Sequence, residues 1–144
     1  MLGMKVPGPS GASFEIREDP DGLLCTVLDG EFSEDMGRAL GAACLRMVES
    51  GREVVLLCDA RRAGALPPAA RKVLADEMRG VRLPAVAVVG ASFTMRVAAT
   101  LTAKSIEFLT GRSYPVKFVA TEAEGRAWLL TQRDALRAKR GPVA

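Results

Sequence analysis

Two continuous apolar segments constrain the fold of this 144-residue chain most strongly. Residues 53–59 (EVVLLCD) and residues 84–90 (PAVAVVG) have no polar side chain between their ends. A strand with one wet face alternates apolar and polar residues, whereas a strand buried on both faces is continuously apolar. Strands of the second kind are typical of parallel sheets covered by helices on both faces. The two segments therefore predict an α/β fold in which parallel strands alternate with helices.

The N-terminal part of the chain predicts a flexible leader followed by a hairpin. Residues 1–12 are rich in Gly and Pro and lack apolar periodicity, so we assign them to a leader outside the fold. Residues 14–18 alternate apolar and charged side chains, and residues 19–22 (DPDG) have the composition of a turn. Residues 23–28 are more apolar. This order predicts two antiparallel strands joined by a short turn.

Four helices are predicted from capping residues and from apolar side chains at intervals of three and four residues. The first follows Ser33, the third follows Ser92, and the fourth follows a capping box at residues 121–124. The second begins at the two prolines of residues 67–68. For the third helix, the side expected to carry its apolar positions consists of Ala98, Leu101, Ser105, Phe108 and Leu109.

These elements assemble into one predicted domain. We expect a single mixed five-stranded sheet, with an N-terminal antiparallel hairpin followed by parallel βα units, and four helices. Residues 115–120 alternate in polarity and are expected to form an edge strand. The domain is expected to span residues 13–138, and residues 139–144 are expected to form a disordered tail.

Histidine is absent from the sequence, which excludes several classes of site. Catalytic triads built on histidine cannot form, and the commonest general base and zinc ligand are missing. The three cysteines, Cys25, Cys44 and Cys58, are spaced neither as a metal-binding pair nor as a CxxC redox pair. We expect them to be small core residues in a reducing compartment. The sequence therefore predicts neither a metal ion nor a cofactor.

Charge and hydropathy predict a cytoplasmic protein with no nucleic-acid partner. The chain has 20 basic and 17 acidic residues, a formal net charge of +3, and only 5% aromatic residues on which bases could stack. No segment resembles a signal sequence, and no run of about 18 apolar residues could span a membrane.

Candidate binding residues lie where the predicted parallel strands end, because ligands of open α/β sheets bind beyond the carboxyl ends of the strands. They are Asp59, Arg61 and Arg62 after the central strand, Ser92 before the third helix, and Arg96 and Lys104 along that helix. Each also has a structural interpretation. Asp59 could end its strand by bonding nearby amides, Ser92 could be a simple cap, and the cations could face solvent.

Three short segments resemble a known group of proteins. The segments VVLLCDAR, VAVVGAS and TEAEGRAWL, in this order after a hairpin, resemble bacterial SpoIIAA-like proteins of the STAS and SEC14-like group, over about residues 14–130. The resemblance implies a mixed sheet with helices packed on it. In the anti-sigma factor antagonists of this group, a serine at the start of the helix after the central strand is phosphorylated. Here residues 59–71 (DARRAGALPPAAR) contain no Ser or Thr, so this phosphorylation switch is not expected.

Two functions of different classes remain. The first is a non-enzymatic STAS-like protein-interaction or regulatory module, which we expect to form a homodimer and to bind a protein partner of unknown identity. The alternative is a carrier or sensor of a small apolar or lipid-like ligand, which the SEC14-like resemblance and the small residues of the third helix suggest. An enzyme based on Asp59 and Arg61 is a third interpretation, but no catalytic constellation in the sequence supports it.

Overall fold

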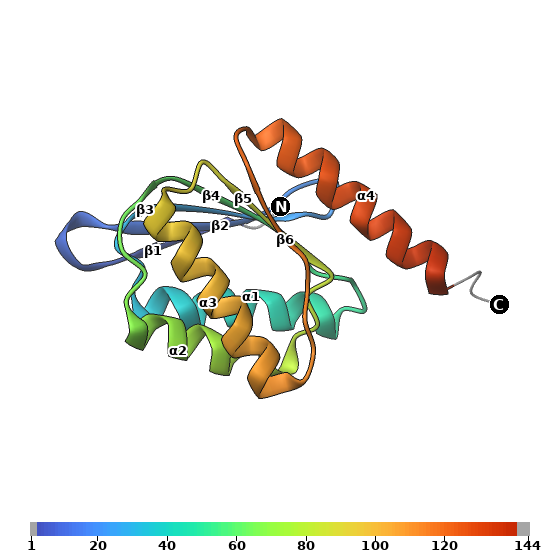
Figure 1. Cartoon of the computed structure of the whole chain (residues 1–144), viewed down its shortest axis with the longest axis horizontal. Helices are drawn as coiled ribbons and strands as arrows, with labels where there is room; N and C mark the ends of the chain where they lie inside the picture. The colour runs from blue at the N-terminus through green and yellow to red at the C-terminus, as the bar shows by residue number, and fades with distance from the viewer. Residues whose placement is uncertain (1–2, 141–144) are drawn as a thin grey trace.

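The computed structural model describes residues 3–140, and within this range six strands form one mixed sheet in the order β1-β2-β3-β4-β5-β6 (Figure 1). The first three strands pair antiparallel, and β3 to β6 pair parallel. The predicted hairpin is therefore confirmed, and so is the edge position of the last strand. The strands are β1 Gly3–Pro7, β2 Ser13–Glu18, β3 Leu24–Gly30, β4 Val55–Ala63, β5 Ala85–Val89 and β6 Val116–Val119.

Four α-helices lie within the described residues and cover the two faces of the sheet unequally. Figure 1 shows α1, α2 and α3 on one face and α4 alone on the other, running past the edge of the sheet at its C-terminal end. Short 3-10 turns, Pro9–Gly11 and Met78–Gly80, flank β1 and α2. The helices are α1 Glu34–Glu49, α2 Pro68–Glu77, α3 Phe93–Thr110 and α4 Glu122–Arg140.

The central strands form two separate cores, because successive side chains of a strand point to opposite faces. Along β4, Leu56 packs with α1, α2 and α3, whereas Val55 and Leu57 pack with α4. The smaller core is closed by Leu129 of α4, which is fully buried. Gly125 lets α4 approach closely, since a β-carbon there would lie only 2.8 Å from Leu57 Cδ1. The continuous apolar sequence of β4 and β5 thus follows from burial on both faces.

The predicted leader is the main correction to the fold. Residues 3–7 form β1, which pairs with β2 and places Val6 opposite Phe14. The sheet therefore has six strands in the described residues, and not five. A segment this rich in Gly and Pro has no local strand signal, but the free edge of β2 supplies hydrogen-bond partners that the sequence does not show. Of the tail expected at 139–144, residues 141–144 lie outside the described residues, while α4 continues to Arg140.

The predicted helix caps are confirmed. Ser33 Oγ accepts a hydrogen bond from Met36 N at 3.2 Å, and Ser92 Oγ accepts one from Met95 N at 3.1 Å. Thr121 Oγ1 likewise accepts from the Glu124 backbone at 3.2 Å. The box at the start of α4 differs in its return bond, because the Glu124 carboxylate accepts from the Thr121 hydroxyl rather than from its backbone.

Candidate functional site

Asp59 and Arg61 lie within a strand and bind each other. β4 continues past Asp59 to Ala63, so these residues belong to the strand end rather than to the loop expected from the sequence. Arg61 donates through Nε and Nη2 to the two carboxylate oxygens of Asp59, at 3.0 and 2.6 Å. These hydrogen bonds hold the pKa of the Asp59 carboxyl below its usual range. The pair is therefore internally neutralised, and Asp59 is not poised as a base.

Arg61 also covers the end of the neighbouring strand. Gly90 follows β5 with a φ of +66°, and a β-carbon there would overlap Arg61 Cγ. This contact joins the Asp59–Arg61 pair to the Gly90–Ser92 segment, as expected for neighbouring strand ends. Arg62 instead pairs with Asp29 of β3 at 3.0 Å, where both side chains are exposed.

The remaining predicted residues do not converge on the same point. Ser92 caps α3, and Arg96 donates through Nε to the Ala91 carbonyl at 3.3 Å. The Arg96 guanidinium also lies 5.7 Å from the centre of the Phe118 ring. Lys104 lies more than two turns further along α3 and faces Glu107 at 3.9 Å. The structure thus brings Asp59, Arg61, Ser92 and Arg96 to one edge and leaves Lys104 apart.

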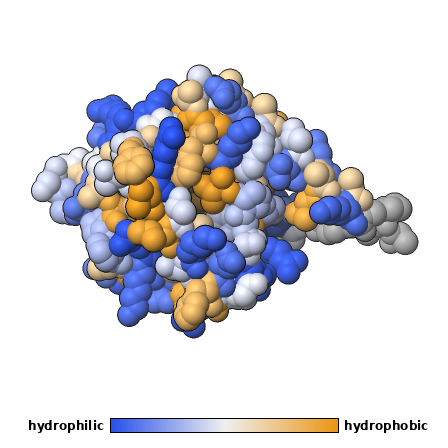
Figure 2. Space-filling model, in the orientation of Figure 1, coloured by the Kyte–Doolittle hydropathy of each residue, from blue (hydrophilic) through white to orange (hydrophobic). Residues whose placement is uncertain are grey.

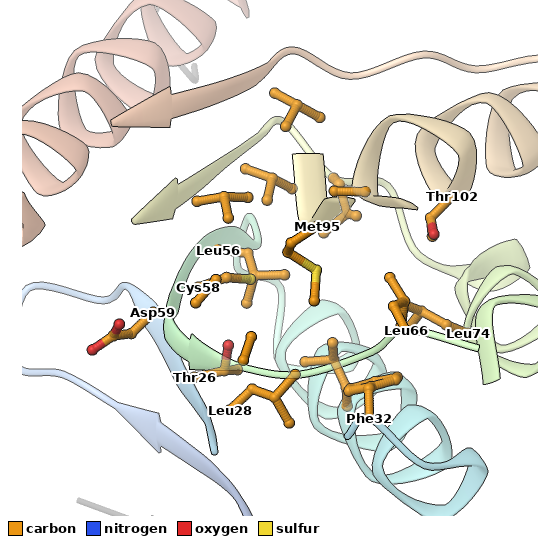
Figure 3. A pocket seen from close by; sticks show the side chains of 18 of the residues that line it. Thr26, Leu28, Phe32, Leu56, Cys58, Asp59, Leu66, Leu74, Met95 and Thr102 are labelled. Atoms are coloured by element: carbon orange, nitrogen blue, oxygen red, sulfur yellow. The ribbon is translucent and has the colours of Figure 1, made fainter. Parts of the chain in front are cut away.

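An apolar cavity of about 120 Å³ lies between the sheet and helices α1 to α3 (Figure 3). Leu56, Leu66 and Met95 are among its lining residues, and the Met95 side chain points into it. Polar groups on its wall are turned to other partners. Thr102 Oγ1 donates to the Ala98 carbonyl at 2.9 Å, and the Asp59 carboxylate points away from the cavity. The space therefore suits an apolar occupant.

No acid or base suited to catalysis at neutral pH faces this cavity. Burial raises the pKa of the Cys58 thiol to about 11, although a hydrogen bond with Thr26 opposes the shift. Burial also raises the pKa of Tyr114 above its ordinary value. Both groups are protonated at neutral pH, and the cavity therefore stays uncharged apart from the Asp59 carboxylate at its rim.

The outer side of α3 carries exposed apolar residues, two of which the sequence predicts on the core side. The helix buries Met95, Ala98, Thr102 and Ile106, whereas Leu101 and Phe108, expected on the core side, are exposed. Four exposed apolar residues share the outer side and are called here the α3 face. They are Phe93, Val97, Leu101 and Phe108, with 82%, 44%, 48% and 88% of their surface accessible.

This stripe carried a signal in the sequence, because α3 has apolar residues on two sides at helical spacing. Only one side can pack on the sheet, and the periodicity does not say which. The apolar stripe predicted to face the core lies between the buried side and the exposed side of α3. It therefore includes residues of each side. Figure 2 shows apolar and hydrophilic side chains intermingled over the helical face of the molecule that carries α3.

A groove of about 600 Å³ runs between α2 and α3 beside the α3 face, and we call it the basic groove. Its apolar lining includes Leu101, Phe108 and Leu109. Its charged lining consists of the cations Arg71, Lys72, Arg79 and Lys104 and the single acid Asp76. Of these residues, only Lys104 is a binding candidate predicted from the sequence.

The described residues show neither a metal-binding cluster nor a membrane-spanning helix. Among residues 3–140, no three His, Cys, Asp or Glu side chains cluster in a way that could hold a metal ion. None of the helices described in this range combines the length and the apolar character needed to cross a membrane.

Comparisons with known proteins address the fold. No family model matches the chain, and no curated protein matches it. Among solved structures, the chain is similar to an uncharacterized protein from the DUF3478 family with a SpoIIAA-like fold, from Shewanella loihica PV-4. The two are 16% identical, with a TM-score of 0.54 over 90% of this chain and 96% of that chain. At this identity the likeness shows the fold alone, and it confirms the SpoIIAA-like fold expected from the sequence.

Proposed function

We propose that this SpoIIAA-like domain is a non-enzymatic protein-interaction module that acts in the cytoplasm and binds its partner through the α3 face. The observation that carries the proposal is the exposure of Phe93 and Phe108, at 82% and 88%, together with Val97 and Leu101 between them. Single exposed apolar residues are common on monomers, but several that share one side of one helix indicate an interaction surface.

The chemistry of the strand ends supports a function without catalysis. Asp59 is bound by Arg61, Arg96 is held by the Ala91 carbonyl, and Ser92 accepts from a backbone amide. The chain has no histidine, and burial raises the pKa of Cys58 to about 11. A general base or an activated nucleophile therefore has no evident source in this region.

Phosphorylation at the usual position of anti-sigma factor antagonists is not part of the proposal. The segment between Asp59 and α2 contains no Ser or Thr, and α2 begins after Pro67 with no side-chain cap. Partner binding would then depend on the concentration of the partner rather than on a phosphate at this helix. The homodimer predicted from the sequence stays a prediction, which sedimentation equilibrium tests directly.

The test is in-cell crosslinking of the wild-type chain and the double variant Phe93→Ser with Phe108→Ser. Both side chains are exposed, so the variant should keep its fold and its circular dichroism spectrum. We expect it to lose the crosslinked partner that the wild type captures. Leu45→Ser, at an exposed apolar position of α1, is the matched control and should keep the partner. Equal capture by the double variant and the wild type would contradict the proposal.

The apolar cavity favours a second candidate, a carrier or sensor of a small apolar ligand. At about 120 Å³ it is close to engineered cavities of about 150 Å³ that bind benzene, and smaller than the ~300 Å³ of typical ligand pockets. A lipid chain would therefore require α2 or α3 to move. Benzene should raise the Tm of the wild type but not of Ala99→Leu, which fills the cavity wall. The absence of a Tm shift, with no retained mass in native mass spectrometry, would exclude this candidate.

A further inference from the structure

We propose that the basic groove between α2 and α3 receives an acidic amphipathic helix of a different protein. The proposal rests on the interaction function proposed above and specifies the chemistry of the partner. It follows from the shape of the groove, from its apolar lining, and from the sign of the charge around it.

The groove has the shape and lining of a helix-binding site. It is formed by two packed helices and has a volume of about 600 Å³. Ala75 is buried within it, and Leu101, Leu109 and Phe108 keep 48%, 39% and 88% of their surfaces accessible. An amphipathic helix places apolar side chains three and four residues apart into such a groove. The apolar lining thus predicts the apolar side of the occupant.

The charge of the groove predicts the polar side of the bound helix. Four cations and one acid line it, which gives a formal excess of three positive charges. Within the described residues, neither Arg71 nor Lys72 forms an ion pair. Arg79, in the 3-10 turn after α2, pairs weakly with Asp76 at 3.5 Å, and Lys104 pairs weakly with Glu107 of α3 at 3.9 Å; both cations remain exposed. Carboxylates along a bound helix would offer all four cations a partner of opposite charge.

The same charges argue against two other occupants. A second copy related by a two-fold axis would place this surface against itself, and cations would then face cations. A bilayer is flat, whereas the groove is concave, and Asp76 inside the groove together with Glu107 beside it would face anionic headgroups. A separate acidic helix satisfies both the shape and the charge.

The test uses a synthetic fluorescein-labelled helix of about 18 residues, the length of α3, with Leu along one side and Glu on the other. A peptide with Lys in place of Glu is the charge control, and vesicles of phosphatidylcholine and phosphatidylglycerol are the lipid control. Fluorescence anisotropy should show binding of the Glu peptide by the wild type that weakens with added salt. The Lys peptide and the vesicles should not bind.

Variants then locate the site. Lys72→Glu with Lys104→Glu should weaken binding of the Glu peptide by about tenfold or more, because it reverses charges on both walls. Phe108→Ser should weaken it about fivefold through the lost apolar contact. Leu45→Ser is the matched control, because Leu45 is an exposed apolar residue of α1 that neither belongs to the α3 face nor lines the groove. It should change the dissociation constant by less than about twofold.

Several results would overturn the inference. They are failure of the Glu peptide to bind, equal binding of the Lys peptide, vesicle binding in place of peptide binding, or equal effects of Leu45→Ser and Phe108→Ser. Dimerisation that the Lys72→Glu and Lys104→Glu variant abolishes would assign the groove to a second copy. The two proposals can also fail separately. If the Glu peptide does not bind but the double variant Phe93→Ser with Phe108→Ser still loses its crosslinked partner, the interaction function stands and only the acidic helix is rejected.

Discussion

Arg126 of α4 donates through Nη2 to Asp19 Oδ2 at 2.6 Å, which ties the last helix to the turn between β2 and β3. The same guanidinium bonds Asp21 and Glu122, while Arg133 donates to the Asp21 carbonyl at 2.6 Å. Asp19 also accepts from Arg17 and from the Cys25 thiol. This network therefore holds α4 in place in addition to the apolar contacts of Leu129.

Replacing Arg126 should weaken the attachment of α4. Arg126→Met keeps the aliphatic stem but leaves Asp19 and Asp21 without this cation, so we expect the free energy of unfolding to fall by about 2 kcal/mol. Urea denaturation measures the change. Arg137→Met removes a single pair at 3.4 Å between an exposed arginine and Glu53, and should cost about 0.5 kcal/mol or less. Similar losses for the two variants would mean that the partly buried network of Arg126 contributes no more than a single ion pair.

Acid should destabilise the protein through Asp19. Hydrogen bonds from Arg17 and Arg126 hold the pKa of the Asp19 carboxyl well below its usual range, against the opposing effect of burial. A carboxyl with a lowered pKa in the folded state contributes stability above its unfolded pKa of about 4 and loses it as the pH falls further. Unfolding free energy should therefore drop as the pH decreases below about 5.

Asp19→Asn tests this assignment. The variant should be less stable than the wild type at pH 7 and should show a smaller decrease in stability between about pH 5 and pH 2. Asp35→Asn, at a highly exposed side chain of α1, is the control. An acid dependence unchanged by Asp19→Asn would show that other carboxyls dominate it.

Gly90 should tolerate no side chain. With a φ of +66° and Arg61 Cγ in the place of a β-carbon, Gly90→Ala should lower the free energy of unfolding by about 2 kcal/mol. Removing the obstruction with Arg61→Ala should restore part of this loss in the double variant. In Gly80→Ala the new β-carbon meets no atom within 4 Å, so this control should leave the free energy of unfolding nearly unchanged. Thermal unfolding measures the stability of all these variants. A Gly90→Ala variant as stable as the wild type would contradict the close contact between Gly90 and Arg61.

The three thiols should react slowly in the folded protein. Burial raises the pKa of Cys58 to about 11 and those of Cys25 and Cys44 to about 12. At pH 8 only about one Cys58 in a thousand is then a thiolate, and the thiolate is the reactive form. Ellman's reagent should label all three rapidly in denaturant but slowly in buffer. One rapidly labelled thiol in the native protein at pH 8 would contradict this expectation.

Patterns along the chain predicted most of the elements correctly, because each has a local cause. Burial on both faces excludes polar residues from β5 and from the first half of β4, Val55–Cys58, and Ser33 and Ser92 satisfy backbone donors within one turn of their own position. β1 is not predicted, because its cause is not local. Its pairing partner is the free edge of β2, and nothing within Gly3–Pro7 itself indicates a strand.

The candidate binding residues stay a prediction. Asp59, Arg61, Ser92 and Arg96 do meet at one edge of the sheet, as strand topology requires, but each is occupied by an intramolecular partner. The basic groove was missed because its cations come from two helices separated in sequence. Local spacing cannot show that Lys72 and Lys104 line one groove.

By itself, then, the sequence determined the alternation of strands and helices, the hairpin, the caps and the absence of histidine chemistry, because these depend on neighbours within a few residues. Tertiary structure alone decided which apolar side of α3 faces the sheet, since Met95 and Ile106 fit against it whereas Phe93 and Phe108 do not contribute to its core. Packing between distant segments makes that choice, and it leaves exposed the surface through which we propose the protein works.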